Sequence, residues 1–162
     1  MDEYKGNNYE YTFNDSAYTF NNEAIGMVAI ASVLNYMQRV SISKAMLILP
    51  LALHEPTINY LKLKSVKVKS LEQLIADKYH LLTNFNKRYK SLMPISLNSL
   101  FLLEEMEIIS MKGGIISLEK EINFDDSRLG KRGKNVNKSA LNIKNILDDD
   151  VEYLYLQLRV EL

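Results

Sequence analysis

The stretch Met46-Leu47-Ile48-Leu49-Pro50-Leu51-Ala52-Leu53 decides the fold class, because it is an unbroken apolar run with a proline inside it. It is closed by His54-Glu55-Pro56-Thr57. Proline has no backbone N–H and its ring crowds the preceding turn, so we expect Pro50 to kink a helix or to separate two short helices. Eight helical residues reach about 12 Å against a hydrocarbon core of roughly 30 Å. We therefore expect a buried element of a soluble domain, bent at Pro50 and ending before Pro56.

The composition of the chain predicts one folded domain. Its 162 residues, of which 47% are hydrophobic and 25% charged, are typical of a globular protein with a single core. The sequence contains no cysteine, which excludes disulfides, thiolate metal sites and a cysteine nucleophile. Met1 is not followed by the basic-then-apolar pattern of a secretory signal, so we expect a cytoplasmic protein.

Helices dominate the expected structure of residues 21–162, which form a single, mostly helical domain after an irregular N-terminal arm at 1–20. One of the asparagines at 21 and 22 is a suitable N-cap for the first helix, and Ser70 is suitable for a later one. Pro94 is expected to begin a further helix, because proline is favoured in the first turn.

The segment 151–162 fits two patterns. Leu154 and Leu158 share a helical face with Val151, yet apolar residues also alternate along the same segment as they do in a strand. We expect a helix through Leu158 followed by a short extended end.

The strongest local signal in the chain is a β-hairpin at 108–118. Two runs with β-branched residues flank Lys112-Gly113-Gly114, and glycine supplies the positive φ angles that a tight turn requires. A helix followed by a hairpin is the order of recognition helix and wing in winged-helix modules. We therefore expect a mainly α fold with a small β-hairpin wing (α+β), a winged-helix-like single domain. Glutamates end the preceding helix and would repel phosphates, so the hairpin indicates architecture and not DNA contact.

Residues 123–137 are polar and contain two glycines among cations, so we expect a basic, mobile loop there. Its cations are candidates for nucleic-acid binding, because arginine and lysine pair with phosphates. Two other interpretations remain open: a solvated loop in a lysine-rich chain, or a basic surface that docks on an acidic protein. Sites that bind single-stranded nucleic acid usually place aromatic residues among their cations, and no aromatic residue lies among these cations. The candidates are Arg128, Lys131, Arg132, Lys134 and Lys138.

Motifs of catalytic sites are missing or incomplete. The segment His54-Glu55-Pro56-Thr57-Ile58 lacks the second histidine of a zinc-protease helix, and Gly130-Lys131-Arg132-Gly133-Lys134 lacks the spacing of a phosphate loop. Aspartates at 125–126 and 148–150 are more typical of solvated turns and caps than of a magnesium site. We expect no enzymatic activity, no cofactor and no metal.

Several segments together resemble the middle component of bacterial three-component ABC (ABC-3C) systems. The resemblance spans most of residues 20 to 160, and its most diagnostic part is the leucine-rich stretch that ends in His54-x-Pro56-Thr57. The segments are Phe20-Asn21-Asn22-Glu23-Ala24, Leu47 through Thr57, Phe85-Asn86-Lys87-Arg88-Tyr89 before Leu92-Met93-Pro94, and the hairpin after Leu103-Glu104.

This resemblance implies a small adaptor encoded between an SMC/Rad50-like ABC ATPase and an effector, often a nuclease. Such systems are associated with defence against phage and plasmids, including the Lamassu type. The implied partners are these two proteins, with DNA contacted through the complex and no membrane. We expect the hairpin and one further set of residues to bind partners: Leu49, Pro50, His54, Pro56 and Thr57. The alternative is a free-standing winged-helix regulator that binds DNA.

Overall fold

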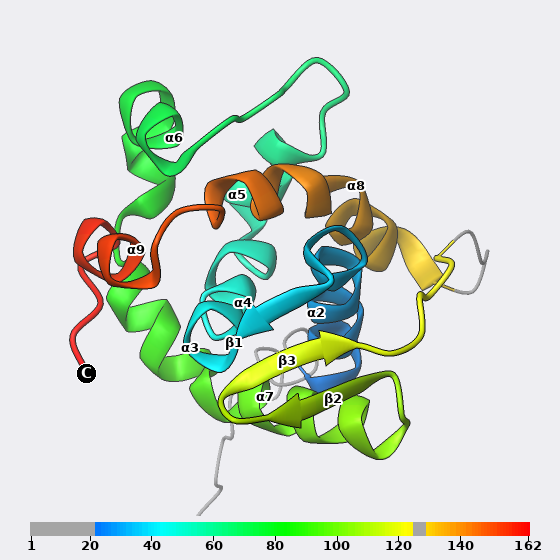
Figure 1. Ribbon diagram of the computed structural model, residues 1–162. Helices are drawn as coiled ribbons and strands as arrows, with labels where there is room; N and C mark the ends of the chain where they lie inside the picture. The colour runs from blue at the N-terminus through cyan, green and yellow to red at the C-terminus, as the bar shows by residue number, and fades with distance from the viewer. Residues whose placement is uncertain (1–21, 125–128) are drawn as a thin grey trace, which may run out of the picture.

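The computed structural model describes residues 22–124 and 129–162 (Figure 1). Its strands are β1 (Arg39–Ser41), β2 (Ile109–Lys112) and β3 (Ile115–Leu118). Its helices are α2 (Glu23–Met37), α3 (Ile42–Ala45), α4 (Ile48–Ala52), α5 (Glu55–Leu61), α6 (Leu71–Lys78), the 3₁₀ helix η1 (Tyr79–Leu82), α7 (Phe85–Glu105), α8 (Gly130–Ile146) and α9 (Val151–Gln157). The expected fold class, mainly helical with a small antiparallel sheet, is confirmed.

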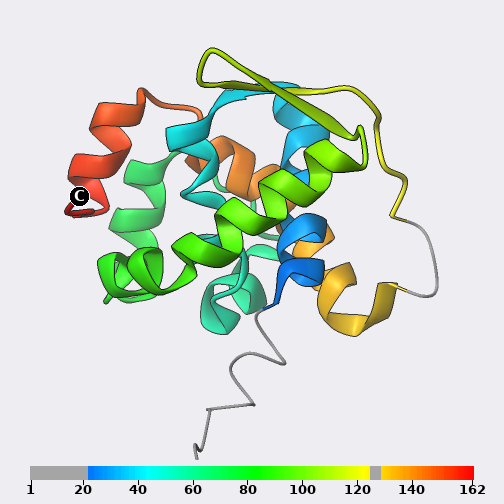
Figure 2. The same ribbon diagram turned by 90° about the horizontal axis from the view of Figure 1, so that it is seen from below.

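α2 is the central helix of the domain. Residues 29–34 are buried without interruption, because α4, α7 and α8 pack around this helix (Figures 1 and 2). A helix that is apolar on every side is stable only when it is covered on every side. The Asn22 side chain accepts from the backbone N–H of Ile25 at 3.2 Å, which confirms the expected cap. Gly26 brings α2 close to α7, since an added Cβ would overlap the Ser99 hydroxyl.

The predicted hairpin is confirmed, and a third strand, β1, extends it to a three-stranded sheet. Gly113 and Gly114 have φ values of 57° and 77° in the turn between β2 and β3. β1 pairs antiparallel with β3, so that the strand order is β1-β3-β2. β1 was not expected, because three residues are too short for a recognisable alternation. The sheet joins the N-terminal half of the domain to the hairpin that follows α7 (Figure 1).

Pro50 lies inside the short helix α4, so it does not separate two helices, and the expected bend at Pro50 stays a prediction. It is the third residue of α4, in a turn whose N–H groups have no helical acceptor, so its missing N–H removes no helical hydrogen bond there. The Arg88 guanidinium donates from Nε to the Pro50 carbonyl at 3.2 Å and from its other nitrogens to the carbonyls of Leu81 and Thr83. Arg88 thereby fixes α4 against the start of α7.

The expectation that Pro94 begins a helix is wrong. α7 runs without interruption from Phe85 to Glu105 with Pro94 inside it. Its buried positions continue across the proline at helical spacing, from Tyr89 and Leu92 to Ser96 and Leu100. Packing of this face against α2 and α4 therefore outweighs the hydrogen bond that proline removes.

The expected loop at 123–137 is also wrong in its second half. α8 begins at Gly130, and residues 130–137 are helical. Glycine and asparagine are poor helix formers, which is why the sequence pattern indicates a loop. The helix is held by burial of Val136, Ala140 and Ile143 against its neighbours. The expected N-terminal arm at 1–20 and residues 125–128 lie outside the described residues.

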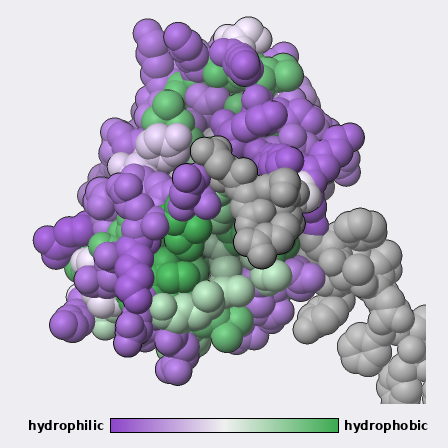
Figure 3. All heavy atoms as spheres, turned by 90° about the vertical axis from the view of Figure 1, so that its right-hand side faces the viewer, coloured by the Kyte–Doolittle hydropathy of each residue, from purple (hydrophilic) through white to green (hydrophobic). Residues whose placement is uncertain are grey.

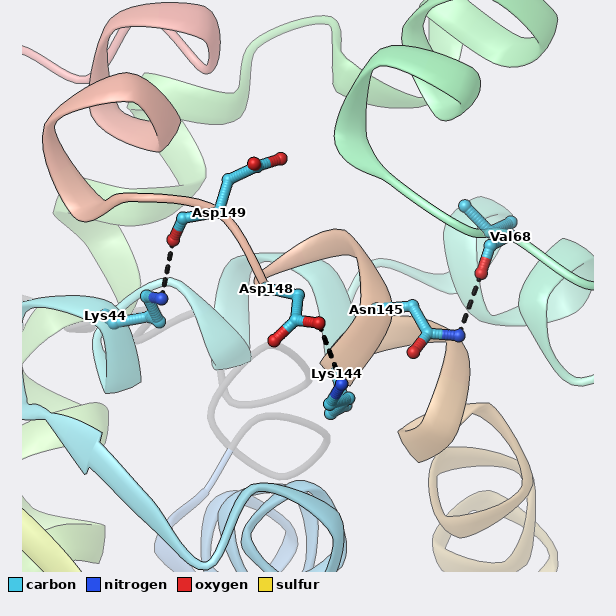
Figure 4. A network of polar contacts seen from close by, with 6 residues as sticks. All are labelled: Lys44, Val68, Lys144, Asn145, Asp148 and Asp149. Carbon is cyan, nitrogen blue, oxygen red and sulfur yellow. Dashed lines mark hydrogen bonds and ion pairs between the residues drawn. The ribbon is translucent and has the colours of Figure 1, made fainter.

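Polar contacts connect the end of α8 to its surroundings (Figure 4). Lys44 donates to the Asp149 carbonyl at 2.6 Å, and Lys144 pairs with Asp148 at 2.9 Å. The Asp150 side chain accepts from the N–H of Glu152 at 2.9 Å and caps α9. The helical interpretation of the last segment is confirmed; the Asp148 side chain pairs with Lys144 and the Asp150 side chain caps α9.

Candidate protein-binding site

A groove of about 730 Å³ lies between α5 and α8. It brings together the two regions that the sequence singled out separately, the apolar run that ends near Thr57 and the cations after residue 128. The floor of the groove is apolar and is formed by Ala52, Leu53, Ile58 and Val136. These four side chains are at most 7% exposed, so they form the outer layer of the core.

The rim of the groove is polar and carries more positive than negative charge. Among the described residues that line the groove, the charged ones are the cations Lys62, Lys131 and Arg132 and the carboxylate Glu55. Burial lowers the pKa of the half-buried Arg132, and the nearby Glu55 carboxylate opposes that shift. Lys62 donates to the neutral Asn59 amide oxygen at 2.8 Å, so this contact leaves its charge uncompensated.

Lysines extend the positive charge along α8. Lys131, Lys134 and Lys138 are exposed and follow each other at spacings of three and four residues, which places them on one face of the helix. No acidic residue lies in the first turn of α8. Cations at the positive end of a helix dipole cost about 0.3–1 kcal/mol each at the surface. This end of α8 thus carries a charge arrangement that stability alone does not favour.

Two asparagines of α8 hold the segment that leads out of α5. The Asn142 amide donates to the carbonyls of Leu61 and Val66 at 2.8 and 3.1 Å, and its oxygen accepts from the N–H of Val68 at 2.9 Å. Asn145 donates to the Val68 carbonyl at 3.0 Å (Figure 4). α5 and α8 are therefore fixed relative to each other. Neither asparagine could be singled out from the sequence, since polar residues on a predicted helix give no signal of their distant partners.

The structure places most of the predicted partner-binding residues inside the protein. Leu49, Pro50 and Thr57 are buried, so the expectation that they contact a partner is corrected for the protein as folded here. Pro56 is exposed and His54 is half-buried. The part of this region that reaches the surface is the wall of the groove.

The His54 side chain contacts the start of α5. Its Nδ1 and the Thr57 hydroxyl lie 2.7 Å apart, across the start of α5. Burial and, to a lesser extent, the positive charge of Arg88 lower the pKa of His54 to about 4. The imidazole is therefore neutral near pH 7.

A second exposed surface lies on the outer face of α7. Leu97, Phe101 and Leu102 in the C-terminal half of α7 and Met106 just beyond its end are 38–57% exposed. We call these four residues the α7 face. Figure 3 shows apolar surface in the lower half of the molecule, which is the half that holds the hairpin and α7 in Figure 1. Helical period predicts that Leu97 and Phe101 face the core together with Leu100 and Leu103, which is wrong for the first two, because period alone does not show which of several apolar positions turn outward.

The remaining predicted positions give no further site. In residues 22–124 and 129–162, histidine and acidic side chains form no group of three or more that could hold a metal ion. Within the same ranges, every helix is too short or too polar to cross a membrane. Arg128 and the aspartates at 125–126 lie outside the described residues.

Comparisons with known proteins give one result. The family model described as "ABC-three component (ABC-3C) system Middle Component 3" matches residues 14–162. No curated protein and no solved structure shows a significant match to the chain.

Proposed function

Because the chain belongs to the ABC-3C system Middle Component 3 family, we propose that it is a non-catalytic adaptor. In this proposal it links an SMC/Rad50-like ABC ATPase to an effector of nuclease type within a cytoplasmic complex. The complex acts in defence against phage and plasmids, with the Lamassu type as the specific assignment to be tested. The resemblance in the leucine-rich stretch supports these finer statements.

One observation carries the proposal: two unlike surfaces lie on different elements of one small chain. The groove is built by α5 and α8, whereas the second surface is the α7 face. α2 packs against both α7 and α8 and separates them. A bridging subunit needs two surfaces that are occupied at the same time, and this arrangement provides them.

The experiment is co-expression of the chain with the two companions encoded beside it, followed by purification through a tag on the chain. We expect a complex of all three proteins. Leu97→Ser with Phe101→Ser should release one companion and retain the other. The matched control is Leu156→Ser, since Leu156 is a 74% exposed leucine on α9. A wild-type chain that purifies alone, or a purified chain that hydrolyses ATP, nucleic acid or peptide, would contradict the proposal.

A free-standing DNA-binding regulator is the second candidate. The line of Lys131, Lys134 and Lys138 along α8 favours it, since a row of cations pairs with phosphates. The α7 face argues against it, because the helix before the hairpin exposes leucine and phenylalanine where a recognition helix carries polar side chains. The regulator hypothesis predicts salt-sensitive duplex binding that weakens when these lysines, Arg128 and Arg132 are replaced by glutamine. Duplex binding that is unchanged in the glutamine variant would contradict the regulator hypothesis.

A further inference from the structure

We propose that the groove between α5 and α8 binds an acidic segment of a companion protein, which rests an apolar side chain on Leu53, Ile58 and Val136. This inference rests on the proposed adaptor function and names the chemistry of one of its partners. It assigns the groove to one class of occupant, a protein segment rich in aspartate and glutamate.

The floor of the groove explains the apolar anchor. Leu53, Ile58 and Val136 belong to the core, yet they also line an open space of about 730 Å³. A side chain of leucine or phenylalanine size that enters this space removes its own surface and the exposed remainder of the floor from water. Interfaces typically derive much of their affinity from such an anchor in a pocket.

The rim explains the acidic character of the segment. In the part of the chain that the structure describes, three cations and one carboxylate line the groove, and Lys62 is bonded to a neutral amide. The positive charge continues from Lys131 to Lys138, a distance of about 10 Å along the helix axis at 1.5 Å per residue. A partner with several carboxylates would neutralise this row, and complementary charge also speeds association and excludes other partners.

The same residues favour a protein over a nucleic acid. Among the described residues that line the groove there is no aromatic ring on which a base could stack. The apolar floor offers no side-chain donor to a phosphate, whereas it can pack against an apolar side chain of a protein. Nucleic acid would pair with the lysines of α8 and would leave the apolar floor of the groove uncovered.

The first experiment uses photo-crosslinking in the full three-component complex. A benzoyl-phenylalanine replaces Asn59 on the exposed rim of the groove, and in a control chain it replaces Leu156 on α9. We expect crosslinks from position 59 to one Asp/Glu-rich segment of the ATPase or the effector, identified by mass spectrometry. Crosslinks from position 59 only to nucleic acid, to a second copy of the chain or to residues 1–21 of the chain itself would overturn the proposal.

The second experiment reverses charge. Lys131→Glu with Lys134→Glu should weaken binding of that companion about tenfold at low salt, and the difference should shrink as salt screens the charges. Lys87→Glu with Lys90→Glu makes the same change of charge on exposed lysines of α7 and should leave binding unchanged. Circular dichroism should show that all variants are folded.

These outcomes separate the inference from the adaptor function. If the complex forms and neither the crosslinks nor the charge reversal point to the groove, the inference fails and the adaptor function stands. If the wild-type chain forms no complex, both fail.

Discussion

The groove and the α7 face differ in shape, in charge and in how the fold supports them. The groove is concave, has a basic rim, and depends on hydrogen bonds from Asn142 that fix α5 to α8. The α7 face is apolar and rests on a close helix crossing at Gly26. Binding at the groove should therefore respond to salt, whereas binding at the α7 face should respond to the position of α7. One chain thus offers two kinds of contact that can be disturbed independently.

Removing the polar support of the groove should have the largest effect. In Asn142→Ala two backbone carbonyls and one N–H lose their partner, so we expect the free energy of unfolding to fall by about 3 kcal/mol. Urea denaturation followed by circular dichroism measures this change. Asn145→Ala removes a single hydrogen bond and should cost about 1 kcal/mol. Equal effects of the two variants would show that Asn142 has no special role in holding α5.

Disturbing the support of the α7 face should have the next largest effect. In Gly26→Ala the new methyl group overlaps the Ser99 hydroxyl and forces α7 away from α2. We expect a loss of about 2 kcal/mol, the usual range for overpacking. Thermal unfolding of Gly26→Ala, Ser99→Ala and the double variant tests the cause. The double variant should recover part of the loss, and strict additivity would contradict the proposed overlap.

A smaller effect of opposite sign is expected at the rim of the groove. Lys131→Glu places a carboxylate in the first turn of α8, so the protein should become more stable by about 0.5 kcal/mol. The same variant carries half of the charge reversal that should weaken companion binding. Lys112→Glu, at the exposed end of β2, is the control for a general charge effect on unfolding. A destabilised Lys131→Glu protein would show that the helix dipole is not the dominant influence there.

The smallest effect concerns pH. His54 has a pKa of about 4 in the folded protein and 6.5 as a free side chain, so the unfolded chain binds the proton more readily. Its contribution to stability is fully present above pH 6.5 and is lost as the pH falls toward 4. In His54→Asn the melting temperature should therefore fall less between these pH values than in the wild type. If the melting temperatures of the wild type and of His54→Asn fall in parallel between these pH values, His54 is not the source of the pH dependence.

Local chemistry in the sequence predicted the elements whose signals lie within a few residues. Asn22 and Ser70 accept from N–H groups three positions later, as cap residues do, and Gly113-Gly114 supplies the turn of the hairpin. The start of α8 escaped prediction, because Gly130 and Gly133 indicate a loop while burial of Val136 against distant helices makes the segment helical.

The candidate site was predicted in its parts and not as a whole. The apolar run around Leu53 and the cations near Lys131 were both singled out, but they lie more than seventy positions apart in the chain. That they form two walls of one groove depends on how α5 and α8 pack, which no local pattern encodes. The proposed role of Arg128 in nucleic-acid binding stays a prediction.

The uninterrupted burial of residues 29–34 in α2 has a consequence for the protein during its synthesis. α2 leaves the ribosome before α7 and α8, which cover it, and β1 leaves before its partner strand β3. Contacts between distant parts of a chain form late and leave apolar surface open in the meantime. A message cut short before residue 146 would yield a product with its hydrophobic centre uncovered, a substrate for chaperones and proteases. Only completed copies would then reach assembly.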